Sequence, residues 1–182
     1  MLREFFTIER CTYMHDNADE ILPVVDAEGH VIGQATRGTC HGGSMLLHPV
    51  VHLHVFNPEG ELFLQRRPAW KDIQPGKWDT AVGGHVDWGE TIDEALHREA
   101  REEIGLTDFI PRPCTPYVFT SDRERELVHP FTTVTTASLR PTAELDGGRF
   151  WSREDIVGHL GKDVFTPQFE QEYRRLFCSE PL

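Results

Sequence analysis

The sequence predicts one α/β domain in which β-strands precede and follow a long acidic helix. Alternating apolar and polar residues, interrupted by turn-forming residues, run from about residue 20 to residue 67 and resume after residue 115. Between them lies a charged stretch from Gly84 to Leu106 with helical spacing, and two more helical segments close the chain. Strands that lead into a central helix and then resume favour an α/β sandwich, with helices packed against a β-sheet.

The first strands form two predicted hairpins. ILPVVD and VIGQATR flank the turn AEGH at residues 27–30. HPVVHLHVF and ELFLQRR flank a second turn at residues 57–60, which contains Asn, Pro and Gly. We expect His52 and His54, on the first arm of this hairpin, to be structural. That arm should have two different faces, with Val51, Leu53 and Val55 on one and His52, His54 and Phe56 on the other.

The remaining elements complete a single domain. A loop over residues 68–77 leads to the strand WDTAVGG and then to the acidic helix. Later strands are expected in PYVFTS, LVHPFTTVTTASL and GRFWS, followed by helices in REDIVGHL and TPQFEQEYRRLF. A length of 182 residues suits one domain over residues 1–182, with residues 1–18 as an N-terminal extension that shows no clear pattern.

Charge and hydropathy exclude several classes of function. The formal net charge of −12 argues against nucleic acid polymers and anionic membranes as partners. No apolar run approaches the ~20 residues that cross a bilayer, and the first residues lack the apolar core of a signal peptide. The four cysteines are scattered without a C-x-x-C pair, as free thiols in a reducing compartment would be. The sequence therefore predicts a cytoplasmic protein.

Three glutamates of the acidic helix form the strongest candidate site. Glu99, Glu102 and Glu103 stand at i, i+3 and i+4, which places all three carboxylates on one helix face. Because like charges at this spacing repel one another, the arrangement favours a bound cation. Mg²⁺ and Mn²⁺ prefer such oxygen ligands and usually bind phosphate oxygens as well. The alternative interpretation is a solvated surface helix with ordinary Glu–Arg ion pairs.

The same stretch resembles the Nudix hydrolase family, whose signature is G-x5-E-x7-R-E-U-x-E-E-x-G-U, where U is a bulky aliphatic residue. Every fixed position is matched, and the small Ala100 occupies the first aliphatic position. The matching residues are Gly84, Glu90, Arg98, Glu99, Ala100, Glu102, Glu103, Gly105 and Leu106. The resemblance implies an α/β/α sandwich with a mixed β-sheet, in which the Nudix box forms a loop-helix-loop.

The resemblance also implies how the box residues act. The three glutamates of the helix would bind Mg²⁺ or Mn²⁺, with the backbone carbonyl of Gly84 as an additional ligand. Arg98 and Glu90 would hold the loop and the helix in place and orient the ligands. The catalytic set implied by the family is therefore Glu90, Arg98, Glu99, Glu102 and Glu103.

The general base is left open by the sequence. A divalent cation makes water more acidic, so that a carboxylate can accept its proton as the water attacks phosphorus. Glu103 is our first candidate for this base. Family members also take the base from a loop or strand outside the box, where Glu124 and Glu126 precede a predicted strand and Asp122 is a weaker candidate.

From about Val24 to His129 the chain also resembles one branch of the family, the isopentenyl-diphosphate isomerases. In that enzyme two His seven residues apart, a third His before the box and one or two downstream Glu bind a metal. The corresponding residues here are His41, His48, His85 and Glu126 or Glu124, and the diphosphate-binding residues correspond to Arg67 and Lys71. The alternative is that the scaffold retained these histidines without a metal.

One departure argues against isomerisation. The isomerase has its catalytic Cys immediately before Gly-His, and Gly83 occupies that position here. A glycine has no side chain to move a proton, so the acid–base pair for isomerisation is broken.

The sequence therefore predicts a hydrolase that uses Mg²⁺ or Mn²⁺. Its substrate would be a small-molecule diphosphate, such as a nucleoside diphosphate linked to another group, cleaved at the phosphoanhydride bond. The alternatives are an isomerase-like enzyme and a non-catalytic Nudix-fold ligand sensor. Trp88 in the box loop is a candidate for stacking on a substrate ring, whereas Trp78 is expected to pack in the fold. An exposed edge strand could pair two subunits as a homodimer.

Overall fold

A separate β-hairpin begins the part of the chain that the computed structural model describes, residues 17–71 and 73–178. Strand β1 (Ile21–Val25) pairs antiparallel with β2 (Val31–Thr36), and the short helix α1 (Arg37–Cys40) follows directly. The first predicted hairpin is thus confirmed. Most of the predicted N-terminal extension, residues 1–16, lies outside the described residues.

Eight strands form the main sheet, which is mixed, as predicted. Their order is β10–β4–β3–β9–β7, with β5 paired to β4, β6 to β3 and β8 to β9. Strands β3 and β9 run parallel, and the other neighbours are antiparallel. The strands are β3 (Leu47–Phe56), β4 (Leu62–Arg66), β5 (Trp78–Thr80), β6 (Val82–His85), β7 (Arg112–Pro113), β8 (Tyr117–Thr120), β9 (Arg125–Val134) and β10 (Gly148–Trp151).

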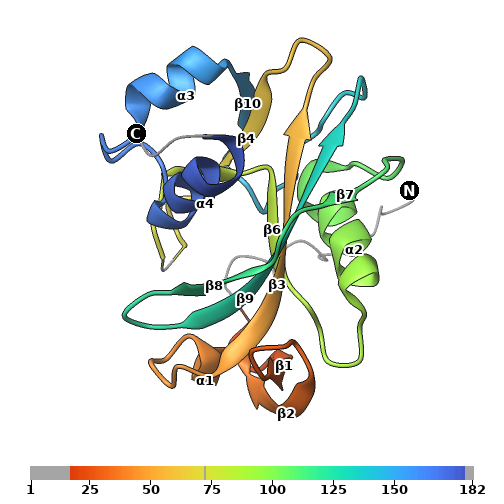
Figure 1. Ribbon diagram of the computed structural model, residues 1–182, viewed down its shortest axis with the longest axis vertical. Helices are drawn as coiled ribbons and strands as arrows, with labels where there is room; N and C mark the ends of the chain where they lie inside the picture. Colours follow the sequence, from red (N-terminus) through yellow and green to blue (C-terminus); the bar gives the residue numbers. More distant parts are fainter. Residues whose placement is uncertain (1–16, 72, 179–182) are drawn as a thin grey trace, which may run out of the picture.

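Helices cover both sides of this sheet, which confirms the α/β/α arrangement (Figure 1). Helix α2 (Ile92–Ile104) lies on one side, and α3 (Arg153–His159) and α4 (Pro167–Phe177) lie on the other. None of the helices within residues 17–71 and 73–178 has the length and apolar character needed to cross a membrane.

Helix α2 has strong signals at both ends. The side chain of Thr91 accepts a hydrogen bond from the backbone of Glu94, and the Glu94 side chain accepts one from the backbone of Thr91. The helix ends at Gly105, whose φ of 67° lies in the left-handed region that glycine adopts without strain. These signals fix where the acidic face of the helix begins and ends.

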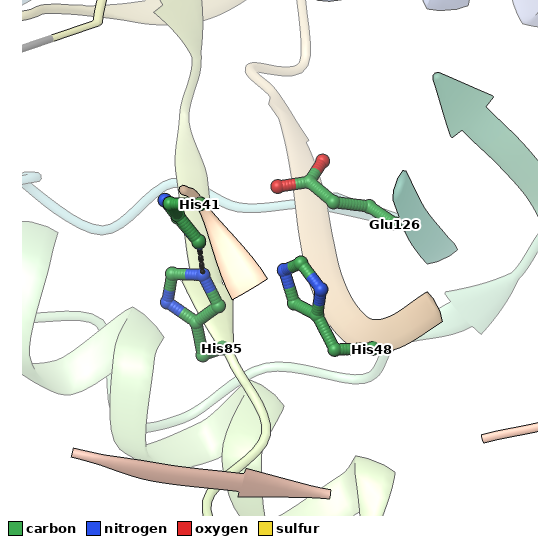
Figure 2. A group of neighbouring side chains, drawn as sticks. All are labelled: His41, His48, His85 and Glu126. Carbon is green, nitrogen blue, oxygen red and sulfur yellow. Dashed lines mark hydrogen bonds between the residues drawn. The ribbon is translucent and has the colours of Figure 1, made fainter. Parts of the chain in front are cut away.

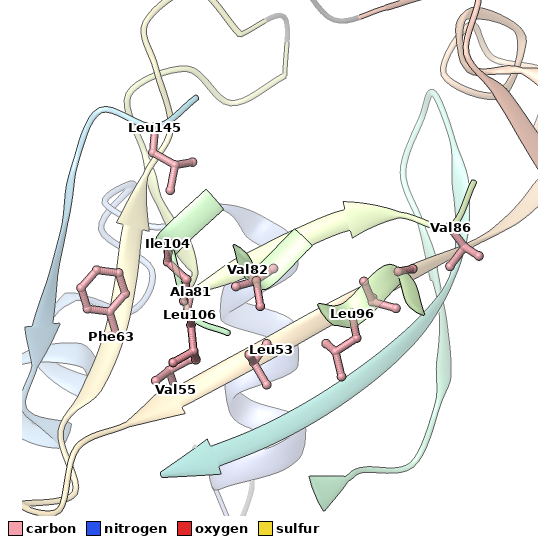
Figure 3. Packing of buried hydrophobic residues seen from close by; sticks show 13 residues of the cluster. Leu53, Val55, Phe63, Ala81, Val82, Val86, Leu96, Ile104, Leu106 and Leu145 are labelled. Atoms are coloured by element: carbon pink, nitrogen blue, oxygen red, sulfur yellow. The ribbon is translucent and has the colours of Figure 1, made fainter. Parts of the chain in front are cut away.

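The two faces of β3 carry two separate cores. Val51, Leu53 and Val55 belong to the cluster beneath α2, in which Figure 3 labels Leu53 and Val55, and the small Ala100 is fully buried in the same cluster. On the opposite face, a second cluster packs beneath α3 and α4 and consists of Leu62, Leu64, Trp151, Ile156, Phe165, Phe169 and Tyr173. Trp78 packs against this second cluster, as predicted.

The second predicted hairpin is confirmed, but its strands pair only near the turn. Strands β3 and β4 meet at Val55–Phe63 and Phe56–Leu62. Beyond these pairs the two strands diverge, and each takes a new neighbour: β4 pairs with β5, and β3 pairs with β6. The segment from β5 to β6 therefore lies between β4 and β3. Strand β6 therefore occupies the centre of the fold (Figure 1). Its successive residues face opposite sides of the sheet.

Candidate metal-binding active site

Three histidines from distant parts of the chain gather at one end of β3 (Figure 2). His41 follows α1, His48 lies on β3 and His85 ends β6, and the centroids of their rings are 4.9 to 5.5 Å apart. Glu126 joins them from β9, where it lies opposite His48. One potential ligand atom from each of the four residues lies within 4.8 Å of the other three. The structure thus brings together the histidine set that the isomerase resemblance implied.

The histidine cluster has the properties of a transition-metal site. Nε2 of His41 and Nε2 of His85 are 2.9 Å apart and share a hydrogen bond, so the two nitrogens face each other (Figure 2). Nε2 of His48 is buried without a hydrogen-bond partner among the described residues. Burial lowers the pKa of His48, and burial together with Arg37 and the neighbouring histidines holds the pKa of His85 well below its usual range. Neutral imidazole is the form that binds metal, so these residues fit such an ion.

The box glutamates lie on the other side of β6 and are unequally buried. Glu103 is buried and accepts hydrogen bonds from the backbone N–H of Gly83 at 2.9 Å and from the side chain of Gln65. Glu99 packs on Gly84 so closely that a Cβ added there would lie 2.0 Å from Cδ of Glu99. Glu102 remains 42% exposed. The first two carboxylates therefore face the backbone of residues 83–84, and Glu102 lies toward solvent.

The electrostatics of these glutamates call for a cation. Burial raises the pKa of Glu99 to about 7, although Arg98 opposes this shift. Burial and the facing Glu99 raise the pKa of Glu103 to about 8, against the hydrogen bonds from Gly83 and Gln65. The positive charge of Arg98 thus does not offset the burial of these two carboxylates, and a divalent cation would favour their ionised forms.

Arg98 ties the box together. Its Nε and NH2 groups donate to the two oxygens of Glu90 at 2.9 and 2.8 Å, a two-point ion pair. Its NH2 also donates to the backbone carbonyl of His85 at 3.0 Å, and its NH1 donates to Glu99 at 2.7 Å. One side chain thus connects the box loop, the acidic helix and the strand end that carries His85. The family resemblance implied an orienting function for Arg98 and Glu90, and these contacts join the elements that such a function would hold.

Arg67 and Lys71, the predicted phosphate-binding residues, have different surroundings. Arg67 donates to the carboxylate of Asp79 at 3.3 Å and to the carbonyl of Ile73 at 3.0 Å, so it is held against its own loop. Lys71 lies over the ring of Trp70, and its positive charge lowers the pKa of Glu103. The charge of Lys71 therefore acts at the box glutamates.

Trp88 is 50% exposed and lines a hollow of about 350 Å³ with Pro23, Val31, Gly89 and Glu90. This position beside the box loop leaves its indole available for stacking on a ligand.

The candidate bases outside the box divide into buried and exposed residues. Glu124 is buried, lies 3.1 Å from Nδ1 of His41 and has a pKa raised to about 7 by burial and by Glu126. Glu126 accepts a hydrogen bond from Gln168 of α4. Asp122 is exposed. The histidine cluster therefore has two adjacent carboxylates, whereas Asp122 lies toward solvent.

Sequence reasoning missed several groups that the fold brings to the site. Glu144, in the segment before β10, interacts with Glu102, and burial raises the pKa of its carboxyl. Gln168 and Glu172 of α4 reach β9 and β3, which precede them by more than 40 residues. No local pattern marks these residues, since their positions depend on how the segments pack. Helical spacing places Gln168 and Glu172 on one face of α4, and that is the one signal that links them.

Comparisons with known proteins agree on one family. A family model described as NUDIX domain matches residues 46–172. An uncharacterized Nudix hydrolase of Streptomyces coelicolor, SCO1686, is 35% identical over 164 residues, covering 88% of this chain and 90% of the relative. An isopentenyl-diphosphate delta-isomerase of Leifsonia xyli subsp. xyli is 32% identical over 151 residues, covering 77% of this chain and 79% of the isomerase. The crystal structure of DR0079 from Deinococcus radiodurans has a TM-score of 0.76 at 25% identity and covers 87% of this chain and 99% of that one.

Proposed function

Because this chain belongs to the Nudix hydrolase family, we propose that it uses Mg²⁺ or Mn²⁺ to cleave a phosphoanhydride bond in a small diphosphate substrate. The observation that carries this proposal is the pair of carboxylates, the buried Glu103 and the half-buried Glu99, facing the backbone of residues 83–84. A nucleoside diphosphate linked to another group is the proposed substrate class. A protein of this kind would act in the cytoplasm without a membrane or a nucleic acid polymer.

Each residue of the proposed site has a distinct task. Glu99, Glu102 and Glu103 would hold a divalent cation, which would stabilise negative charge on phosphate oxygens and make water more acidic. Glu103 is our first candidate to accept a proton from water, because its carboxylate is held at the N–H of Gly83 beside the other box glutamates. Arg98 fixes Glu99 and the strand end at His85 in one geometry. Lys71 brings a positive charge to the diphosphate.

The histidine cluster supports a second ion in the same enzyme. Three nitrogens and the carboxylate of Glu126 form a donor set that favours a softer metal than Mg²⁺, such as Mn²⁺ or Zn²⁺. The cluster lies at His85, two residues from Gly83, whose amide donates to Glu103. A diphosphate that crosses Gly83 would therefore meet both sets of ligands.

An isomerase-like activity is the second candidate, favoured by the same histidine set and by the similarity to the Leifsonia enzyme. Gly83 argues against it, since isomerisation needs an acid–base group where this chain has no side chain. A non-catalytic sensor is the third candidate, and the three intact box glutamates argue against it.

A substrate panel with and without metal separates these functions. The purified protein is incubated with Mg²⁺ or Mn²⁺ and nucleoside di- and triphosphates, nucleotide sugars, dinucleotides or isopentenyl diphosphate. Metal-dependent release of phosphate or nucleotide is the expected result. Formation of dimethylallyl diphosphate would support the isomerase instead. Binding without turnover, seen as a thermal shift, would support the sensor.

A further inference from the structure

A buried group of charged side chains lies beneath α4, beside the proposed site. Nδ1 of His52 donates to Oε2 of Glu172 at 2.8 Å, and Nε2 of His54 lies 3.2 Å from the same oxygen. Glu172 is fully buried, and burial alone would raise its pKa, but the two facing imidazoles hold that pKa well below its usual range. A buried ion pair is weak evidence of a stabilising function, because desolvation offsets much of the attraction. The sequence interpretation of His52 as structural therefore leaves this arrangement unexplained.

The second nitrogen of His52 faces Gly83, which has no side chain. A Cβ added to Gly83 would lie 3.6 Å from both Nε2 and Cδ2 of His52, which is ordinary van der Waals distance. His52 is itself only 6% exposed, but Gly83 beside it is exposed to solvent, so the ring edge of His52 lies just beneath the surface at this glycine. Nε2 has no hydrogen-bond partner among the residues that the structure describes, while Glu172 fixes Nδ1. The ring is thus oriented with one nitrogen available to a ligand.

Gly83 is also where the two proposed metal sites meet. Its amide N–H donates to Glu103 on the side of α2. Its α-carbon faces His52 on the side of α4, and His85 of the histidine cluster follows two residues later. A diphosphate lying over Gly83 would therefore contact His52 as well as the metal ligands.

We propose that His52 is a further catalytic residue of this site, held by Glu172, which donates Nε2–H to a phosphate oxygen of the substrate over Gly83. The contact needs no proton transfer: the hydrogen bond stabilises negative charge that develops on the oxygen as the phosphoanhydride bond breaks. This assignment rests on the proposed function. The assignment explains why β3 carries His52 beside Gly83. It also explains why α4 buries the carboxylate of Glu172 against His52.

The surroundings of His52 favour its donor form. Burial alone would lower its pKa, but Glu172 raises the pKa of His52 to about 9, with smaller contributions from Glu126 and Asp79. Protonated imidazole donates from both nitrogens, so Nε2 can donate while Nδ1 stays on Glu172. Several described groups interact with His52 or with its partner Glu172: Glu172 from α4, Glu126 from β9, Asp79 from β5, His54 from β3, Tyr117 from β8 and Cys114 from the segment between β7 and β8.

The test measures binding of methylenediphosphonate, a diphosphate that cannot be hydrolysed, with Mg²⁺ by calorimetry. Three variants are compared: His52→Gln removes the charged donor, Glu172→Gln removes its charged partner, and Gly83→Ala covers Nε2 while leaving the His52–Glu172 pair in place. His54→Gln is the matched control, because it removes the other imidazole on Glu172 without changing the group at Gly83. Circular dichroism and thermal melting check that each variant folds.

We expect His52→Gln to weaken binding about tenfold, the usual effect of losing a charged hydrogen bond. Gly83→Ala should weaken it in the same direction, and the control should bind as the wild type does. For Glu172→Gln the affinity of the variant is divided by that of the wild type at each pH. This ratio should fall as the pH rises from about 6 to 9, because without Glu172 the imidazole of His52 loses its proton at a lower pH. This ratio cancels the titration of the ligand itself.

Equal affinities for the wild type, His52→Gln and Gly83→Ala at every pH would overturn the inference, as would a wild type that does not bind the probe. If His52→Gln fails to fold, the Gly83→Ala result decides. A wild type that binds methylenediphosphonate through His52 but hydrolyses nothing in the substrate panel would remove the proposed hydrolase function and keep the binding contact.

Discussion

The acidic helix and the histidine cluster hold candidate metal ligands in opposite ways. The helix supplies three glutamates from five consecutive residues, and Arg98 of the same box donates to two of them, Glu99 and Glu102. The histidines come from three elements that are separated along the chain, and Glu126 comes from a fourth. Strand β6 serves both sites, because Gly84 faces Glu99 and His85 faces the histidines. Because neighbouring residues of a strand face opposite sides, β6 can serve the acidic helix through Gly84 and the histidine cluster through His85.

The largest expected effect on the hydrolysis rate comes from a substitution in the acidic helix. Glu103→Gln should lower the metal-dependent hydrolysis rate by about 10³-fold, since it removes a ligand charge and the candidate base together. Asp93→Asn is the control, because Asp93 lies on the same helix but its side chain is 78% exposed. The rates are measured on the best substrate of the panel. Comparable rates for the two variants would show that the acidic face does not carry the chemistry.

A glycine substitution tests the contact between helix and strand. In Gly84→Ala the new Cβ would lie 2.0 Å from Cδ of Glu99, so the glutamate must move away from its place. We expect a rate lower by about 10²-fold with a melting temperature near that of the wild type, because the flexible glutamate can yield. Gly158→Ala, with no atom within 4 Å of its new Cβ, is the control. An unchanged rate would mean that the position of Glu99 is not critical.

The buried pair of His52 and Glu172 predicts that the free energy of unfolding depends on pH. Folding raises the pKa of His52 from 6.5 to about 9, so its stabilisation is fully present below pH 6.5 and is lost as the pH rises through 9. The loss should be on the order of 2 kcal/mol in the free energy of unfolding. Urea unfolding across this range measures it, and His52→Gln should flatten the curve. A wild-type stability that does not fall between pH 6.5 and 9 would contradict the buried pair.

Loss of a histidine should affect metal content more than rate. His85→Gln is expected to bind one metal ion fewer than the wild type and to hydrolyse substrate about tenfold more slowly, since the box glutamates remain. His97→Gln is the control, because its side chain on α2 is half-exposed and does not belong to the cluster. Metal content is counted by mass spectrometry after dialysis. Identical content in both variants would leave the histidines without a metal.

The smallest effect concerns the start of α2. Thr91→Ala removes the side chain that caps the helix and should lower the free energy of unfolding by about 1 kcal/mol. The three box glutamates lie at least eight residues further on, so metal affinity should change little. Chemical denaturation and a metal titration of the same samples provide both values. A large loss of metal affinity would show that fraying of the first turn reaches the site.

The sequence predicted the fold and the acidic helix because both depend on local patterns. Alternating residues marked β3 and β4, and the box spacing placed Glu99 and Glu103 on one face. The histidine set needed the family resemblance, since nothing in the spacing of His41 and His85 shows that they meet. The link between His52 and Glu172, 120 residues apart, could not be predicted at all. A buried ion pair of this kind exists only once the C-terminal helix has packed on the sheet.

The central claim is that two metal sites lie on either side of β6, and diffraction from crystals soaked in Mn²⁺ tests it most directly. An anomalous difference map should show one peak among His41, His48, His85 and Glu126, and another between Glu99 and Glu103 beside Gly84. The same map from crystals of Glu103→Gln should lose or weaken the second peak and keep the first. A wild-type map with no peak beside Gly84, at Mn²⁺ concentrations that support activity, would contradict the account.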